Sequence, residues 1–222
     1  MIRTLFFCCA LPALGACSTG SLLDSELPIA SSYVIAPLPP AASATSSPAS
    51  QIDLAIARPD VAPGLDTQRI AVLRGRQLDY YRGAQWGGNT LEIVQSLLVG
   101  SLQNQKLFRS VSSEQARISG AYMLDSEVRD FQAEYVDGRA APIVRVTIIG
   151  RLIRIADRAL VASIEATATS NANDNRLTDV TAAFEAAGHQ IAQQLASGIA
   201  EAISRDQGRV LAIPTPPDRQ VR

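Results

Sequence analysis

The sequence predicts a single α/β domain in which a mixed, mostly antiparallel sheet is covered by two main helices. The first observation is the order of the elements: two strands, a helix, three strands and a second helix. The second is the alternation of apolar residues over 143–155, which is typical of a strand with one buried face. The third is a pair of one-sided apolar stripes, which predict amphipathic helices over 89–105 and 178–204.

The first three elements lie between residues 68 and 105. Gln68–Arg74 and Gln77–Tyr81 are predicted strands because both are β-rich runs next to turn residues. Asn89 and Glu92 have the spacing of a helix N-cap and its reciprocal partner. The helix that follows is expected to end near Gln105 and to bury the stripe Leu91, Val94, Leu98 and Leu102.

Three strand candidates and a long helix form the second half of the domain. Ala121–Glu134 is expected to bend near Phe131, because this side chain falls out of the alternating phase. Leu160–Thr169 is expected to return as the antiparallel partner of Ile143–Ile155. The expected buried faces are Val144, Val146, Ile148 and Leu152 in that strand, and Phe184, Ala187, Ile191, Leu195 and Ile199 in the last helix.

Residues 1–16 have the pattern of a bacterial export signal. Arg3 precedes the apolar run Leu5–Leu14, which is shorter than the roughly 20 residues of a transmembrane helix. Leu14-Gly15-Ala16-Cys17 then resembles the lipobox of bacterial lipoproteins, which implies cleavage before Cys17 and lipidation of its thiol. The alternative is an ordinary secretory signal with an incidental cysteine.

The other cysteines agree with lipidation. Cys8 and Cys9 lie in the segment that would be removed, so Cys17 has no partner for an internal disulfide. The covalent lipid would use its sulfur, and no other cofactor is expected. Ser18 and Thr19 follow, without the aspartate that resembles an inner-membrane retention signal. This favours the outer membrane, with the domain facing the periplasm.

Composition sets the expected domain boundaries. Residues 17–66 are predicted to be a lipidated tether, because the stretch is rich in Pro, Ala and Ser; Ser31–Ile35 is its one strand candidate. The domain is expected to span residues 67–204. Residues 205–222, with Gly208 and three prolines, are predicted to be a disordered tail.

Charge and motif content argue against several functions. Basic and acidic residues number 20 and 21, which leaves no basic excess for binding nucleic acid. His189, the single histidine, is expected to be exposed on the last helix, and the chain lacks nucleophile-elbow and nucleotide-binding motifs. We therefore expect no catalytic residue, no metal site and no enzymatic activity, which makes a hydrolase the weakest hypothesis.

Two groups of side chains are candidates for a partner or lipid surface. Tyr80, Tyr81 and Trp86 form the densest aromatic cluster, and such residues favour half-wet interfaces. The alternative, which we favour, is that they pack a strand-to-helix corner. Arg145 and Arg151 lie in a basic row that suits headgroups or an acidic partner, although nearby acidic residues favour a solvated face.

Several blocks, in order, resemble the ABC-type transport auxiliary lipoprotein family. In that family a tyrosine-rich strand and a tryptophan precede the first helix, as Leu78–Trp86 does here after Arg69–Val72. Tyr33 and Pro37 are similar to its early Tyr-x-Leu-x-Pro element, although Val34-Ile35-Ala36 changes the leucine spacing. The later blocks are Tyr122-Met123-Leu124 with Phe131, and Ala182-Ala183-Phe184-Glu185-Ala186-Ala187; the resemblance covers residues 31 to about 204.

The resemblance implies a fold, partners and a function. The fold would be a three-layer α/β arrangement similar to the TolB amino-terminal domain. The partners would be a mammalian-cell-entry-type substrate-binding protein and the permease and ATPase of an ABC transporter, with a homo-oligomer also implied. The function would be a non-catalytic part in moving phospholipids or other hydrophobic molecules between the two membranes. A general envelope interaction or assembly lipoprotein that binds an outer-membrane protein is the alternative.

Overall fold

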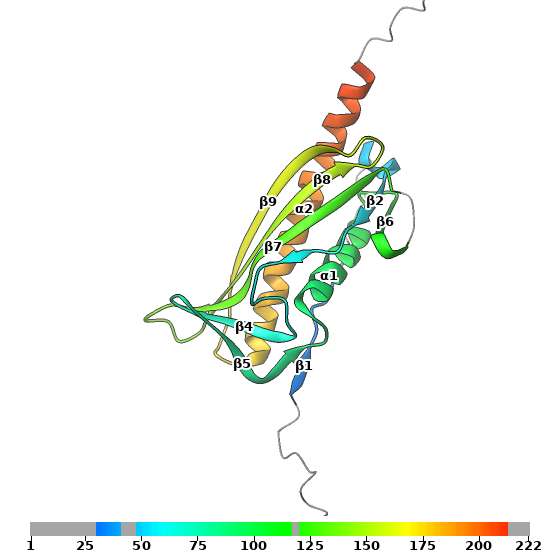
Figure 1. Cartoon of the computed structure of the whole chain (residues 1–222). Coiled ribbons are helices and arrows are strands. Elements are labelled where there is room, and N and C mark those ends of the chain that lie inside the picture. The colour runs from blue at the N-terminus through cyan, green and yellow to red at the C-terminus, as the bar shows by residue number, and fades with distance from the viewer. Residues whose placement is uncertain (1–29, 41–47, 117–119, 213–222) are drawn as a thin grey trace, which may run out of the picture.

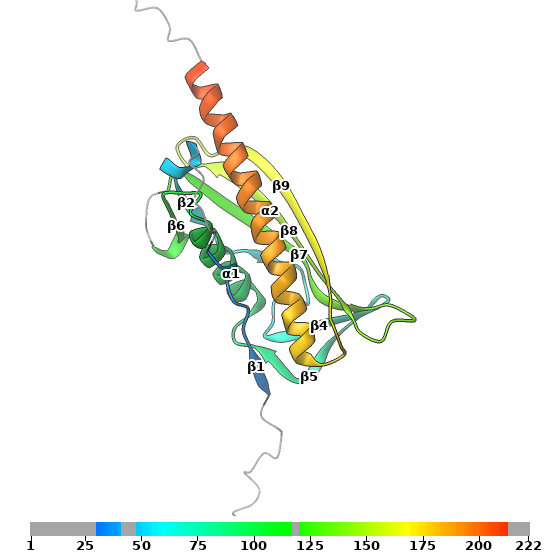
Figure 2. The ribbon, with the colours of Figure 1, turned by 180° about the vertical axis from the view of Figure 1, so that it is seen from behind.

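The computed structural model of the protein describes residues 30–40, 48–116 and 120–212. One mixed sheet carries two long helices on a single face (Figures 1 and 2). The described part therefore has two layers, and the expected third layer is not among its elements. In chain order the elements are β1 Ser31–Tyr33, η2 Pro48–Gln51, β2 Asp53–Ile56, β3 Asp60–Val61, β4 Arg69–Arg74, β5 Gln77–Trp86, α1 Thr90–Gln105, β6 Ser110–Ser113, η3 Glu114–Ala116, β7 Tyr122–Tyr135, β8 Ile143–Arg154, β9 Ala159–Asn171 and α2 Leu177–Ala212.

Strand β7 is the centre of the sheet. Along one edge it pairs antiparallel with β8, which pairs antiparallel with β9, so the expected hairpin is confirmed. Along the other edge β2, β3 and β4 pair with successive stretches of β7, all in parallel. The sheet is extended outward by β6 beside β2, and by β5 and then β1 beside β4.

The expected bend in β7 is also present. The register with β8 shifts between Val128 and Asp130, which is the signature of a bulge. Phe131 thereby returns to the covered face, where it is 1% exposed. The bulge thus reconciles the phase of Phe131 with that of Leu124 and Val128, which are both fully buried.

Helix α1 begins as its sequence predicts. Asn89 is the N-cap, and its side chain and that of Glu92 form a capping box. The helix ends at Gln105, followed by Lys106 in the left-handed conformation. The buried stripe contains the expected Leu91, Val94, Leu98 and Leu102, together with Thr90, Leu97 and Ser101.

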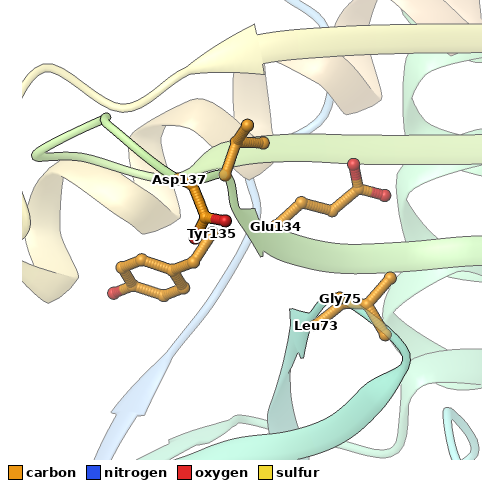
Figure 3. A pocket seen from close by; sticks show the side chains of 6 residues that line it. Leu73, Gly75, Glu134, Tyr135 and Asp137 are labelled. Carbon is orange, nitrogen blue, oxygen red and sulfur yellow. The ribbon is translucent and has the colours of Figure 1, made fainter.

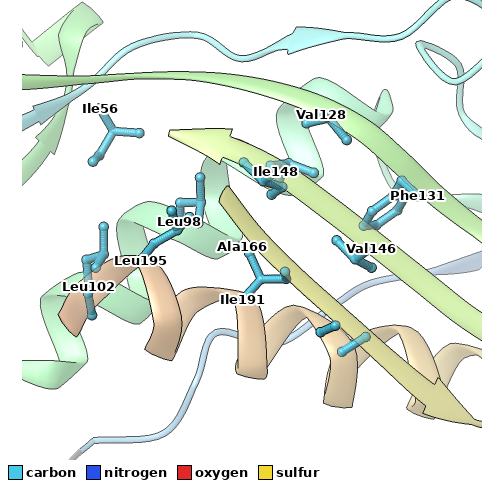
Figure 4. Packing of buried hydrophobic residues seen from close by; sticks show 14 of the residues in the cluster. Ile56, Leu98, Leu102, Val128, Phe131, Val146, Ile148, Ala166, Ile191 and Leu195 are labelled. Atoms are coloured by element: carbon cyan, nitrogen blue, oxygen red, sulfur yellow. The ribbon is translucent and has the colours of Figure 1, made fainter. Parts of the chain in front are cut away.

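Helix α2 has 36 residues, which corresponds to a length of about 54 Å. It crosses the sheet diagonally, and its last turns extend past the strands (Figure 2). Its expected buried face is confirmed, because all five predicted residues are fully buried. Ile191 and Leu195 meet Leu98 and Leu102 of α1 and Ile148 of β8 in the core (Figure 4).

The folded domain extends beyond its predicted boundaries at both ends. Residues 30–40 and 48–66, placed in the predicted tether, contribute η2 and three strands of the sheet. The strand β2 pairs with β6 and β7, and its side chains Leu54 and Ile56 belong to the hydrophobic core and are at most 1% exposed. Residues 205–212, placed in the predicted tail, continue α2. Among these segments the strand candidate Ser31–Ile35 is confirmed in part, as β1 over Ser31–Tyr33. Composition did not reveal the others, because their partners lie far away in the sequence.

The two ends of the domain are distinct. The near end contains the start of β1, the β4–β5 turn at 75–76, the β7–β8 turn at 136–142 and the first turn of α2 (Figure 1). The far end contains η2, the β8–β9 turn at 155–158 and the last turns of α2 (Figure 1).

Candidate functional site

Trp86 lies in the core and not on a surface. It is 1% exposed and forms a three-ring cluster with Phe131 of β7 and Phe184 of α2. The ring centroids lie 5.7 Å and 5.1 Å from that of Trp86, and those of the two phenylalanines lie 5.1 Å apart. Tilted and edge-on arrangements at these distances are favourable. The packing interpretation of Trp86 therefore holds, and its candidacy as a lipid or partner surface is corrected.

Tyr80 and Tyr81 are half-buried and join β5 to its surroundings. The guanidinium of Arg69 lies 3.8 Å from the ring centroid of Tyr80, and the Tyr80 hydroxyl donates to the Gly64 carbonyl at 2.8 Å. The Tyr81 hydroxyl lies 3.0 Å from that of Tyr135. Burial, and then this hydrogen bond, raise the pKa of Tyr81 well above its usual range. Both phenols thus already have partners inside the domain.

Arg145 and Arg151 project from β8 on the face of the sheet that α1 and α2 leave uncovered. Arg145 binds both carboxylate oxygens of Glu134, at 2.8 and 3.2 Å. Arg151 bridges Asp125 at 3.3 Å and Glu127 at 2.6 Å. These hydrogen bonds raise the pKa of each arginine. The predicted basic row is therefore neutralised by carboxylates of the neighbouring strand β7.

The far end of the domain holds a partly buried polar cluster. The Tyr122 hydroxyl donates to Asp206 of α2 at 2.7 Å, and Arg154 donates to the same carboxylate at 3.1 Å. Arg154 also donates to Asp157 in the β8–β9 turn at 3.0 Å. Burial and the hydrogen bond to Asp206 raise the pKa of Tyr122 to about 12. The cluster fixes the late turns of α2 to β7 and β8.

The near end has a cleft between the β4–β5 and β7–β8 turns (Figure 3). Its volume is about 320 Å³, and an adjoining hollow lined by Arg74 and Arg139 has about 560 Å³. The guanidinium of Arg74 lies 4.6 Å from the ring centroid of Tyr135 and forms a long ion pair with Asp79, at 3.9 Å. The residues that line the cleft itself are Leu73, Gly75, Glu134, Tyr135, Val136 and Asp137.

Residues 34–40 form a strap across the outer side of the helix layer, a feature that the sequence pattern did not predict (Figure 2). The Ala36 amide donates to Glu185 at 2.9 Å, and Nε2 of His189 donates to the Ala36 carbonyl at 2.9 Å. Glu185 and His189 are four residues apart, so they lie on one side of α2. His189, expected to be an exposed helical residue, thus binds the strap.

Helix α1 binds the next residues of the strap. The Leu38 amide donates to the buried hydroxyl of Ser101 at 2.9 Å, and Asn104 donates to the Leu38 carbonyl at 2.8 Å. The Leu38 side chain is 6% exposed. A Cβ on Gly100 would come within 2.7 Å of Pro37, so only glycine allows this approach without rearrangement. The strap is therefore held by both backbone hydrogen bonds and close packing.

Among residues 30–40, 48–116 and 120–212, no group of three or more His, Cys, Asp or Glu side chains is arranged to hold a metal ion. Within the same described ranges, no helix is long and apolar enough to cross a membrane. The predicted lipidation site Cys17 and the predicted signal peptide lie outside the described residues.

Comparison with solved structures finds the same fold. A protein from Xanthomonas campestris, described as a member of the DUF330 family, has a TM-score of 0.70 and 23% identity, with 80% of this chain and 99% of that chain covered. A second solved protein, which is described as uncharacterized, has a TM-score of 0.61 and 13% identity, with 77% and 99% covered. A comparison with curated proteins finds no match.

A protein-family comparison identifies the chain more directly. The family model for the ABC-type transport auxiliary lipoprotein component matches residues 33–196. The match begins at the last residue of β1 and includes the strap, every later strand and both long helices up to the middle of α2. It therefore spans most of the chain, including segments that had been assigned to the tether. The chain belongs to the family of ABC-type transport auxiliary lipoproteins.

Proposed function

We propose that this protein is a non-catalytic, lipid-anchored accessory component of an ABC-type system that moves phospholipids or other hydrophobic molecules between two membranes. The observation that carries the proposal is the family match over residues 33–196. The lipobox-like Leu14-Gly15-Ala16-Cys17 supplies the expected anchor ahead of the matched region. The protein would be attached to the outer membrane through Cys17 and face the periplasm.

The roles of the titratable side chains support a binding function. Several groups with shifted pKa values are engaged in pairs that join one element to another. Asp53 of β2, for example, accepts hydrogen bonds from Arg109 and from Ser110 of β6, which lower its pKa to about 2. Tyr122 and Tyr81 likewise each have a partner on another strand or helix. This is the pattern of groups that stabilise a fold, and it supports a scaffold that binds partners.

The proposed partners are a mammalian-cell-entry-type substrate-binding protein and the permease and ATPase of the same system. The protein itself would position its partners at the membrane, because the lipid fixes it there and the domain presents a rigid surface. Energy for transport would come from the ATPase. A homo-oligomer, which the family resemblance also implies, remains a prediction.

The test is affinity purification of the tagged full-length protein from detergent-solubilised envelopes. We expect the substrate-binding protein and the ABC subunits to copurify, and deletion of the gene to increase permeability of the envelope. A matched Cys17→Ala strain should release the protein from the membrane fraction and reproduce the permeability defect. Recovery of an outer-membrane protein without any transporter subunit, together with normal permeability after deletion, would overturn the proposal in favour of a general assembly lipoprotein.

A further inference from the structure

The strap determines where the chain leaves the folded domain. Ala36 is fixed to α2 and Leu38 to α1, and β1 pairs with the end of β5. The chain therefore enters the folded domain at the near end (Figure 1). Ala30 is the first described residue at this point. The path from the lipid to the domain is therefore much shorter than a tether that runs to residue 66.

Chain geometry limits the distance between Cys17 and the near end. Twelve residues, 18–29, connect Cys17 to Ala30. The 13 steps from Cys17 to Ala30 span at most about 47 Å when the chain is fully extended, and a flexible chain of this length has an end-to-end distance of roughly 20 Å. Helix α2 alone is about 54 Å long. An anchor on Cys17 thus brings the near end close to the lipid headgroups, and the far end of α2 is placed further away.

The near end also presents side chains that suit a phospholipid surface. Val136, in the β7–β8 turn, is 49% exposed although it is a large apolar residue. Arg76 and Arg139, in the two adjacent turns, are exposed and have no ion pair within the part of the chain that the structure describes. Asp137 is the one carboxylate in those turns, residues 75–76 and 136–142, so they carry a net positive charge.

Such a surface matches the chemistry of a bilayer interface. Guanidinium groups bind phosphate through paired hydrogen bonds, and an apolar side chain beside them can enter the headgroup region. The uncovered sheet face lacks this combination, because Arg145 and Arg151 are already paired with carboxylates. The near end thus combines three features: the short connection to the anchor, the arginines Arg76 and Arg139 without an ion pair among the described residues, and the exposed apolar side chain of Val136.

We propose that the near end of the domain, through Arg76, Val136 and Arg139, rests on the phospholipid headgroups of the membrane that holds the anchor. The far end of α2 then points away from that membrane, toward the space in which partners are met. This proposal rests on the proposed anchoring through Cys17. It assigns one end of the domain to lipid and leaves the other free for proteins.

The test measures the orientation of the domain on a membrane without requiring that the cell lipidates Cys17. A chain lacking residues 1–16 is coupled through the Cys17 thiol to maleimide lipids in vesicles of zwitterionic and anionic phospholipid, so that anchoring does not depend on the cell. A donor dye is introduced by click chemistry at Thr178 or at Arg209, which are exposed and lie near opposite ends of α2. The two positions are about 46 Å apart along the helix, and energy transfer to acceptor-labelled headgroups is measured for each.

We expect strong transfer from position 178 and little from position 209. Val136→Glu with Arg139→Glu should reduce transfer from position 178, and raising the salt concentration should do the same. The matched control is Leu160→Glu with Arg158→Glu, because these residues pair an exposed apolar group with an arginine near the opposite, β8–β9 turn. That control should leave transfer unchanged.

Two results would overturn the proposal. One is equal transfer from positions 178 and 209; the other is a loss of transfer with the far-end variant and not with the near-end variant. Failure of the proposed function would be seen elsewhere, as loss of transporter copurification or an unlipidated Cys17 in cells. Circular dichroism of each variant verifies that the domain is folded, since all four substituted residues are on exposed turns or strand ends.

Discussion

The two faces of the sheet differ (Figures 1 and 2). On one face, side chains of β7 and β8 are buried under α1 and α2, and the strap lies over those helices. On the other face, the alternate side chains of the same strands project from a surface that no helix covers. The covered face is apolar, and its side chains Trp86 and Phe131 pack against Phe184 of α2. The uncovered face carries arginines, each paired with a carboxylate. The comparison shows that the residues that stand out most in the sequence, Trp86 and the arginines of β8, already have partners inside the domain.

The largest effect should come from the covered face. Trp86→Ala removes the central ring of the aromatic cluster and should lower the free energy of unfolding by about 3–5 kcal/mol. Urea denaturation followed by circular dichroism measures it, because the variant lacks the only tryptophan of the chain. Trp86→Phe, which keeps an aromatic ring, should lose much less. A loss of unfolding free energy smaller than that caused by replacing an exposed arginine would contradict the assignment of Trp86 to the core.

A smaller effect should come from the polar cluster that ties α2 to the sheet. Tyr122→Phe removes a buried hydrogen bond to the Asp206 carboxylate, and should cost about 1.5–3 kcal/mol, as bonds to charged groups do. The control is Tyr80→Phe, whose hydroxyl donates to an exposed carbonyl at Gly64. Equal losses in the two variants would show that Tyr122 and Asp206 are not coupled in solution.

The edge of the sheet should respond to pH. The hydrogen bonds from Arg109 and Ser110 hold the pKa of Asp53 at about 2, below its usual value of about 3.9. The carboxylate therefore stabilises the fold above pH of about 4, and this contribution is lost as the pH falls through about 2. Asp53→Asn should be less stable than the native chain at pH 7, with an effect smaller than that of Tyr122→Phe. Denaturation curves at several pH values should show the difference shrinking as acid is added; a constant difference would contradict the pairing.

The smallest effect should come from the uncovered face. Arg151→Ala breaks ion pairs with Asp125 and Glu127 that are partly exposed, so the cost should be below about 1 kcal/mol. Arg82→Ala, an exposed arginine without an ion pair among the described residues, is the matched control. A loss similar to that of Trp86→Ala would mean that the uncovered face is covered in solution, and would break the contrast between the two faces.

Local patterns predicted those parts of the fold whose stabilising contacts lie close in sequence. The capping box of α1, the hairpin of β8 and β9 and the buried stripe of α2 each follow from spacing within one segment. The bend near Phe131 was likewise readable from a change of phase. The position of Trp86 between a predicted strand and a predicted helix also indicated a strand-to-helix corner, although its two aromatic partners come from β7 and α2.

Segments stabilised by distant partners were not predictable in this way. Leu54 of β2 pairs with Tyr122 of β7, and nothing in the four-residue sequence of β2 indicates that partner. The strap contains Pro37 and Leu38 in a Pro/Ala-rich setting, which on composition alone is typical of a tether. Its order depends on Ser101, Glu185 and His189, which are supplied by two helices 63 to 153 residues away.

The most direct test of this account is whether the strap belongs to the folded helix layer. Amide hydrogen exchange, measured on the mature chain, should show the amides of Ala36 and Leu38 protected to an extent comparable with α1. Ser101→Ala should selectively remove protection from Leu38, because its amide donates to that hydroxyl. Exchange of Ala36 and Leu38 at the rate of an unstructured peptide in the native chain would contradict the account, and would return residues 30–40 to a free tether.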